Sequence, residues 1–140
     1  MHLKFNLSGL GLGNDNRPAV RYQPGLPMLN SLTKGLVSED SGKRGDSVRL
    51  MKALGQAARP AEASVIKRLS RSDDRYFTHD LISLLGAIKS ADPEAHRLFI
   101  GQLLDSDSYV ADEAVAALAA IGAPTAPALK AAFPKVEESY

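Results

Sequence analysis

Two copies of one residue pattern, 33 positions apart, occupy the C-terminal half of the chain. Five residues are identical between the copies: Asp74 and Asp107, Tyr76 and Tyr109, Leu85 and Leu118, Ala87 and Ala120, and Ile88 and Ile121. The same shift places Phe77 on Val110, Asp80 on Glu113 and Ile82 on Val115. A period of this length is typical of helical repeats, whose units bury their apolar faces by stacking on one another. The pattern therefore predicts a repeat protein.

The later copy has the pattern of a helix, a turn and a second helix. Apolar residues recur at three- and four-residue steps over positions 110–121, which predicts one helix with an apolar stripe. Asp107 or Ser106 is suited to the N-cap, because either side chain accepts a hydrogen bond from a free backbone N–H. Gly122 favours the end of this helix, and the prolines that follow favour the start of a second one.

A weaker third copy lies upstream. A shift of 31 residues places Leu81, Leu85 and Gly86 on Leu50, Leu54 and Gly55. We expect Leu50, Met51 and Leu54 to form the apolar stripe of its first helix. The predicted fold is therefore all-α, an α-solenoid of three antiparallel helical hairpins. Their ranges are 47–58 with 60–70, 74–89 with 92–104, and 107–121 with 124–133.

Three segments of the last copy resemble a known repeat family. Val110-Ala-Asp-Glu-Ala114, Leu118-Ala-Ala-Ile-Gly122 and Ala126-Pro-Ala-Leu129 resemble the short HEAT-like repeat of the phycobilisome-lyase type. The resemblance covers residues 47–133 and is specific in the last repeat. The arginine that follows valine in the family is Ala111 here and Thr78 in the preceding copy, so the usual Asp–Arg ladder between repeats is in doubt.

Ankyrin and tetratricopeptide repeats have a similar period. The chain contains no Thr-Pro-Leu-His motif, which argues against ankyrin. The Leu-Gly pairs at positions 54–55 and 85–86 lack the tyrosine that follows three residues later in tetratricopeptide repeats. The HEAT-like interpretation is the one that the residues favour.

The resemblance implies a non-enzymatic scaffold, adaptor or regulator that binds another protein. HEAT-like repeats expose their second helices along a concave surface, where partner proteins bind. The candidate partner-binding residues on that surface are Arg68, Arg71, His96, Arg97, Gln102 and Lys130. If Arg68 and Arg97 act only in binding, reversing their charges should leave the melting temperature nearly unchanged.

Residues 1–46 differ in composition from the rest, because they hold seven of the eleven glycines, all four asparagines and three prolines. Such a segment buries little apolar surface by itself, so we expect a largely irregular arm. Leu3, Phe5 and Leu7 alternate with polar residues as in a short strand. Apolar residues after Pro27 predict a short helix, which either caps the first repeat or forms a linear motif for another protein.

The remaining boundaries follow from this division. Residues 38–46 are interpreted as a polar linker, with the first repeat helix beginning at Ser47. The predicted domains are thus an arm or cap over 1–46, a repeat domain over 47–133 and a tail over 134–140.

Composition and motifs predict no catalytic residue, cofactor or metal. The chain has no cysteine, and its three histidines, His2, His79 and His96, lack the spacing of metal ligands. The glycines at 9, 11 and 13 do not fit the dinucleotide-binding pattern. A net charge of +1 gives no strong field toward nucleic acid. No apolar run approaches the length of a membrane span, so a cytoplasmic protein is expected.

Two other functions stay open. The acid-poor N-terminus is also typical of unstructured export signals, which would make the chain a secreted effector or a secretion-system component. The repeat type also permits a tetrapyrrole lyase-like accessory protein, although the sequence contains no acid–base constellation for that chemistry.

Overall fold

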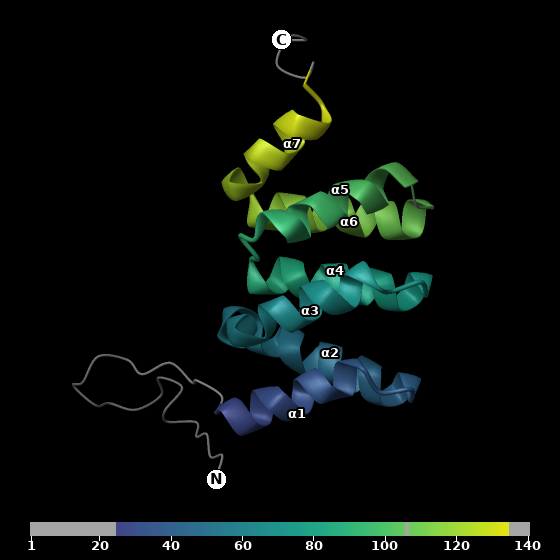
Figure 1. Cartoon of the computed structure of the whole chain (residues 1–140), viewed down its shortest axis with the longest axis vertical. Coiled ribbons are helices and arrows are strands. Elements are labelled where there is room, and N and C mark those ends of the chain that lie inside the picture. The colour runs from purple at the N-terminus through teal and green to yellow at the C-terminus, as the bar shows by residue number, and fades with distance from the viewer. Residues whose placement is uncertain (1–24, 106, 135–140) are drawn as a thin grey trace, which may run out of the picture.

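Every regular element in the described part of the chain is a helix. The computed structural model describes residues 25–105 and 107–134, and no strand occurs in these two ranges. The α-helices are α1 (Leu26–Leu36), α2 (Ser41–Leu54), α3 (Glu62–Ser70), α4 (Arg75–Ile88), α5 (Pro93–Asp105), α6 (Ser108–Ile121) and α7 (Ala126–Ala132). Two 3₁₀ segments, η2 (Gly55–Ala61) and η3 (Ala123–Thr125), connect α2 to α3 and α6 to α7. The all-α prediction is confirmed for these residues (Figure 1).

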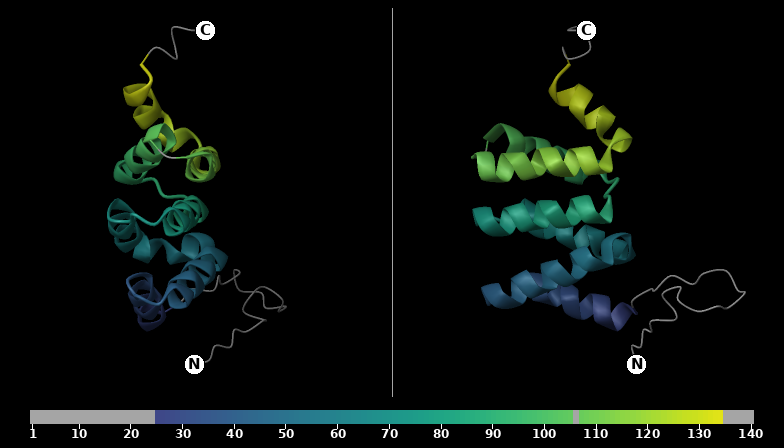
Figure 2. Two further views of the ribbon diagram at one scale, coloured as in Figure 1. Left: turned by 90° about the vertical axis from the view of Figure 1, so that its right-hand side faces the viewer. Right: turned by 180° about the vertical axis from the view of Figure 1, so that it is seen from behind.

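The helices lie in two adjacent rows. In one row α2 packs against α4, and α4 packs against α6. The other row contains α1, α3, α5 and α7, each in contact with the next. Figure 2 shows the rows as two columns when the molecule is viewed from the side. Contacts between the rows, such as those of α3 with α4 and of α5 with α6, enclose a shared core.

The helices α2, α4 and α6, which form the first row, share their length, their N-cap residue and a positive φ at their C-terminal ends. Each of α2, α4 and α6 has 14 residues and follows an aspartate N-cap. The caps are Asp40, Asp74 and Asp107, whose carboxylates accept hydrogen bonds from backbone N–H groups of the first turn. Each helix ends at a residue with positive φ, namely Gly55, Lys89 or Gly122. Each of these three helices, together with the elements that follow it up to the next of the three, is called a unit.

The upstream copy has a different register from the one predicted. Asp40 and Asp74 are 34 residues apart, as are Gly55 and Lys89, whereas the sequence comparison gave 31. With the correct shift Met51 is equivalent to Leu85, and both side chains are fully buried. Leu50 was predicted to be part of the apolar stripe, but half of its surface (50%) is exposed. The prediction was wrong because a three-residue slip is close to one helical turn and preserves most of the apolar periodicity.

The predicted linker over residues 38–46 is mostly helical. α2 begins at Ser41, because the Asp40 carboxylate accepts hydrogen bonds from Gly42 N at 2.8 Å and Lys43 N at 3.3 Å. The Arg44 guanidinium donates to the Ser38 carbonyl at 2.8 Å. The cap and this contact offset the low helix propensity of the two glycines in the segment.

α1 lies against the first unit, in the position that the capping interpretation requires. It packs on α2, η2 and α3 and buries Leu29, Leu32 and Leu36. Gly35 permits the close approach, because a Cβ there would lie 1.8 Å from the Ser47 Oγ and 3.0 Å from the Ser47 Cβ. The predicted strand pattern and export signal, over residues 1–24, and the tail from residue 135 lie outside the described residues.

The units are joined by contacts between corresponding helix ends. Lys89 Nζ donates to the Ala120 carbonyl at 2.8 Å near the C-terminus of α6, and Arg59 donates to the Ile88 carbonyl at 2.9 Å at the end of α4. Cationic donors are favourable there, because the last carbonyls of a helix lack partners and carry partial negative charge. The first unit thus supplies Arg59 to the end of α4, and the second supplies Lys89 to the end of α6.

No single described helix has the length and apolar character to cross a membrane. The bent pair Ser108–Ile121 and Ala123–Ala132 reaches the length and apolar composition of a membrane span only when its two parts are taken together. The angle between the two parts is 116°.

Candidate functional site

The predicted partner-binding residues all lie in the second row of helices, but they do not form one site. Arg68 and the following C-cap residue Arg71 belong to α3, whereas His96, Arg97 and Gln102 belong to α5 and Lys130 to α7. Five of the six line three separate hollows. Arg68 and Arg71 line a groove between α1 and α3, His96 and Arg97 line a cavity between α5 and α7, and Gln102 lines a third hollow.

His96 is a core residue, so its predicted place on the binding surface was wrong. Its side chain is 1% exposed, and its Nε2–H donates to the Ser90 carbonyl at 2.7 Å. Ser90 is also buried, and its hydroxyl donates to the Glu62 carboxylate of α3. A buried carbonyl without a donor is costly. His96 therefore holds the connection between α4 and α5 in place.

Arg97 is exposed but already paired. Its Nε donates to the Glu94 carboxylate at 3.2 Å, one turn earlier on α5. This hydrogen bond and the nearby negative charge raise the pKa of Arg97 above its ordinary value. The cavity beside it, between α5 and α7, has a volume of about 440 Å³ and is lined mainly by prolines and alanines. The α5–α7 cavity therefore offers one paired cation among apolar side chains.

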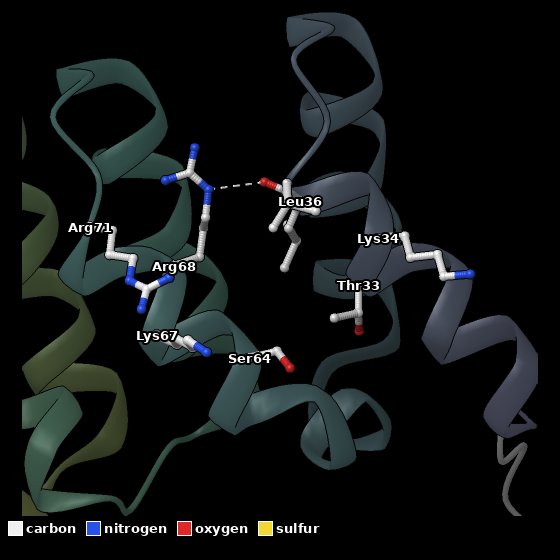
Figure 3. A pocket seen from close by; sticks show the side chains of 8 residues that line it. Thr33, Lys34, Leu36, Ser64, Lys67, Arg68 and Arg71 are labelled. Atoms are coloured by element: carbon white, nitrogen blue, oxygen red, sulfur yellow. Dashed lines mark hydrogen bonds between the residues drawn. The ribbon is translucent and has the colours of Figure 1, made fainter.

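The groove between α1 and α3 concentrates positive charge. It has a volume of about 290 Å³ and is lined by Thr33, Lys34, Leu36, Val37, Ser64, Lys67, Arg68 and Arg71. Figure 3 shows the cations of α3 facing the C-terminal end of α1 across this groove. Four of the lining residues are basic and none is acidic. Of the four, only Arg68 and Arg71 were predicted as site residues.

Arg68 is fixed by contacts within the protein. Its Nε donates to the Leu36 carbonyl at 3.2 Å, at the last residue of α1. Its guanidinium carbon lies 4.8 Å from the centre of the Phe77 ring of α4, which is within the range of a cation–π contact. Because it connects α1, α3 and α4, its charge reversal should lower stability, contrary to the expectation from sequence.

The other three cations of the groove extend into solvent. Lys34, Lys67 and Arg71 are exposed, and none forms an ion pair with a carboxylate among the side chains described for residues 27–104 and 107–134. Lys67 and Arg71 are four residues apart, a spacing that brings like charges together at one side of α3. This uncompensated charge is available to a ligand.

A second polar cluster connects α4 to α6. Arg75 forms an ion pair with Asp107 at 3.1 Å, and its guanidinium lies 5.1 Å from the Tyr109 ring centre. His79 stacks on Tyr109 with ring centres 4.3 Å apart and contacts Glu113 at 3.2 Å. The polar groups of this cluster contact one another, so the arrangement stabilises the packing of α4 against α6. Sequence comparison did not predict this contact, because it depends on how the repeats stack.

No group of three or more histidine, aspartate or glutamate side chains among the described residues is placed to hold a metal ion. No family model, curated protein or solved structure matches this chain.

Proposed function

We propose that this chain is a non-enzymatic protein–protein interaction module, a short α-solenoid of HEAT-like helical hairpins that binds its partner at the α1–α3 groove. The observation that carries the proposal is the set of unpaired cations in a groove on the second row of helices. Binding along the second helices is what the HEAT-like resemblance implies. Arg68 and Arg71, two of the residues predicted from sequence, line this groove.

The arrangement of the helices supports the solenoid part of the proposal. α2, α4 and α6 share their length, their aspartate caps and their positive-φ ends, and they pack in sequence order. Such regular packing of neighbouring units is the feature that defines repeat proteins. In this proposal α1 serves as the N-terminal cap and also supplies one wall of the binding groove.

The groove supports binding of a protein rather than catalysis. Its lining combines cations with the apolar residues Leu36 and Val37 but contains no histidine, cysteine or carboxylate that would act as a base or nucleophile. Val37 is 66% exposed at the edge of the groove. An exposed apolar residue beside long basic side chains provides both contact area and electrostatic attraction for a partner.

Affinity capture with a charge-reversed variant tests this proposal. The full chain carrying Lys67→Glu and Arg71→Glu is compared with the unaltered chain for retention of proteins from a lysate of the source organism, identified by mass spectrometry. We expect a partner protein retained by the unaltered chain to be lost by this variant, because reversal replaces attraction with repulsion. Arg68 is left unchanged, since its contacts stabilise the fold.

A matched variant with Lys43→Glu and Lys52→Glu controls for net charge. Both lysines are exposed residues of α2, and neither lines the groove. The control is expected to retain the partner as the unaltered chain does. Equal retention by all three proteins, or no protein selectively retained, would contradict the proposal.

The secreted-effector and tetrapyrrole lyase-like interpretations stay predictions from sequence. No contact among the described residues favours either one over protein binding.

A further inference from the structure

We infer that the ligand of the α1–α3 groove is an acidic protein segment that places one aliphatic side chain against Val37 and its carboxylates against Lys34, Lys67 and Arg71. This inference rests on the proposed function and specifies the chemistry of the partner. Charge complementarity is its main support, because the groove is lined by four basic residues and no acidic one.

The positions of the cations favour a ligand that has several separate carboxylates over one that has a single anionic group. Lys34 lies in the last turn of α1, Lys67 lies in the last turn of α3, and Arg71 caps α3. The charges therefore come from both helices, and Figure 3 shows Lys67, Arg68 and Arg71 on the α3 side of the groove and the Lys34 ammonium on the side of α1 that faces away from α3. A peptide with acidic residues on both sides of a central residue could reach Lys67 and Arg71 in the groove and, across the end of α1, Lys34.

The helix ends at the groove argue against a single phosphate group as the main ligand. Lys34 and Lys67 mark C-terminal ends of α1 and α3, where backbone carbonyls rather than N–H groups are unpaired. Phosphate sites commonly use the N–H groups and positive dipole of a helix N-terminus. Here the attraction comes from side-chain cations alone, which suits carboxylates spread along a peptide.

The apolar part of the groove lining indicates where the aliphatic side chain of the ligand binds. Val37 is exposed at the edge, and the alkyl stems of Lys34 and Lys67 add apolar surface to the walls. A volume of about 290 Å³ suits a few side chains rather than a whole helix. No aromatic residue lines the groove, so the base stacking that supports single-stranded nucleic-acid binding has no platform there.

Arg68 acts as a positioning residue in this arrangement. Its Nε is bound to the Leu36 carbonyl, so the end of α1 is held beside α3. The separation of the two basic walls is thereby fixed before a ligand binds. A preformed groove lowers the ordering cost of binding.

Fluorescence anisotropy with the full chain tests the inference. The main probe is a labelled peptide, Gly-Asp-Glu-Asp-Leu-Glu-Asp-Glu-Gly, and a second peptide has serine in place of leucine. The third probe has the same length with asparagine and glutamine in place of the acids, and the fourth is a single-stranded oligouridine RNA. We expect the main peptide to bind, and its Kd to rise with ionic strength because exposed charges are screened.

The groove variant with Lys67→Glu and Arg71→Glu is expected to raise the Kd of the main peptide at least about tenfold. The serine peptide should bind about tenfold more weakly than the leucine peptide, because it loses the apolar contact. The Lys43→Glu and Lys52→Glu control should leave the Kd nearly unchanged. Lys34→Glu provides an independent groove variant on α1, and circular dichroism confirms that each variant is folded.

Three results would overturn the inference. The first is equal weakening by the groove variant and the net-charge control, and the second is groove-dependent binding of the RNA without the peptide. The third is failure of the unaltered chain to bind the acidic peptide while it still captures a partner protein in a manner that depends on Lys67 and Arg71. That third result would leave the proposed function standing and reject only the acidic ligand.

Discussion

Met51→Ala is expected to lower the free energy of unfolding by about 2–5 kcal/mol, the usual cost of truncating a large buried side chain. The Met51 side chain is fully buried in α2 and is equivalent to Leu85 of α4 under the 34-residue shift. Removing it leaves a cavity in the contact between the first two units. Urea denaturation followed by circular dichroism measures the change.

Leu50→Ala is the matched control, because it truncates the neighbouring residue of the same helix. Half of the Leu50 surface is exposed (50%), so its loss should change the free energy of unfolding by no more than about 0.5 kcal/mol. A larger cost for Leu50 than for Met51 would show that the 31-residue register predicted from sequence is the correct one.

Gly35→Ala is expected to lower the free energy of unfolding by about 1–3 kcal/mol, because the added methyl group overpacks the contact between α1 and α2. The new Cβ would lie 1.8 Å from the Ser47 Oγ, and rotation of the hydroxyl would still leave the Ser47 Cβ at 3.0 Å. α1 must therefore move away from α2. Because α1 forms one wall of the basic groove, binding at that groove should weaken as well.

Gly101→Ala provides the control for helix propensity. Gly101 lies inside α5, and a Cβ there would meet no other atom within 4 Å. Alanine should therefore stabilise the protein by about 1 kcal/mol, the usual gain over glycine inside a helix. If both substitutions stabilise the protein in urea denaturation, α1 does not pack on α2 as described.

The sequence was sufficient to place the later helices. The aspartates at 74 and 107 and the glycine at 122 carry local signals, and α4 and α6 begin and end within one residue of their predicted ranges. The start of α2 could not be predicted from such local signals. Its first turns contain two glycines and few apolar residues, and they are held by the Asp40 cap and by Arg44, which donates to Ser38.

The candidate site was only partly predictable. Arg68 and Arg71 were recognised because their spacing places them opposite the apolar stripe of α3. Lys67 could have been added from its four-residue spacing to Arg71. Lys34 could not, since its place in the groove depends on the packing of α1 against α3. His96 was misplaced because its partner is a backbone carbonyl, at Ser90, and no side-chain pattern marks such a bond.

The most direct test of the α1–α3 groove is amide chemical-shift mapping of the ¹⁵N-labelled chain during titration with the captured partner protein. We predict that the largest shift changes occur at Lys34 and Val37 on the α1 side and at Ser64, Lys67 and Arg71 on the α3 side. Largest changes on α5 and α7, or around Tyr76 and Tyr109, would place the partner elsewhere and contradict the account.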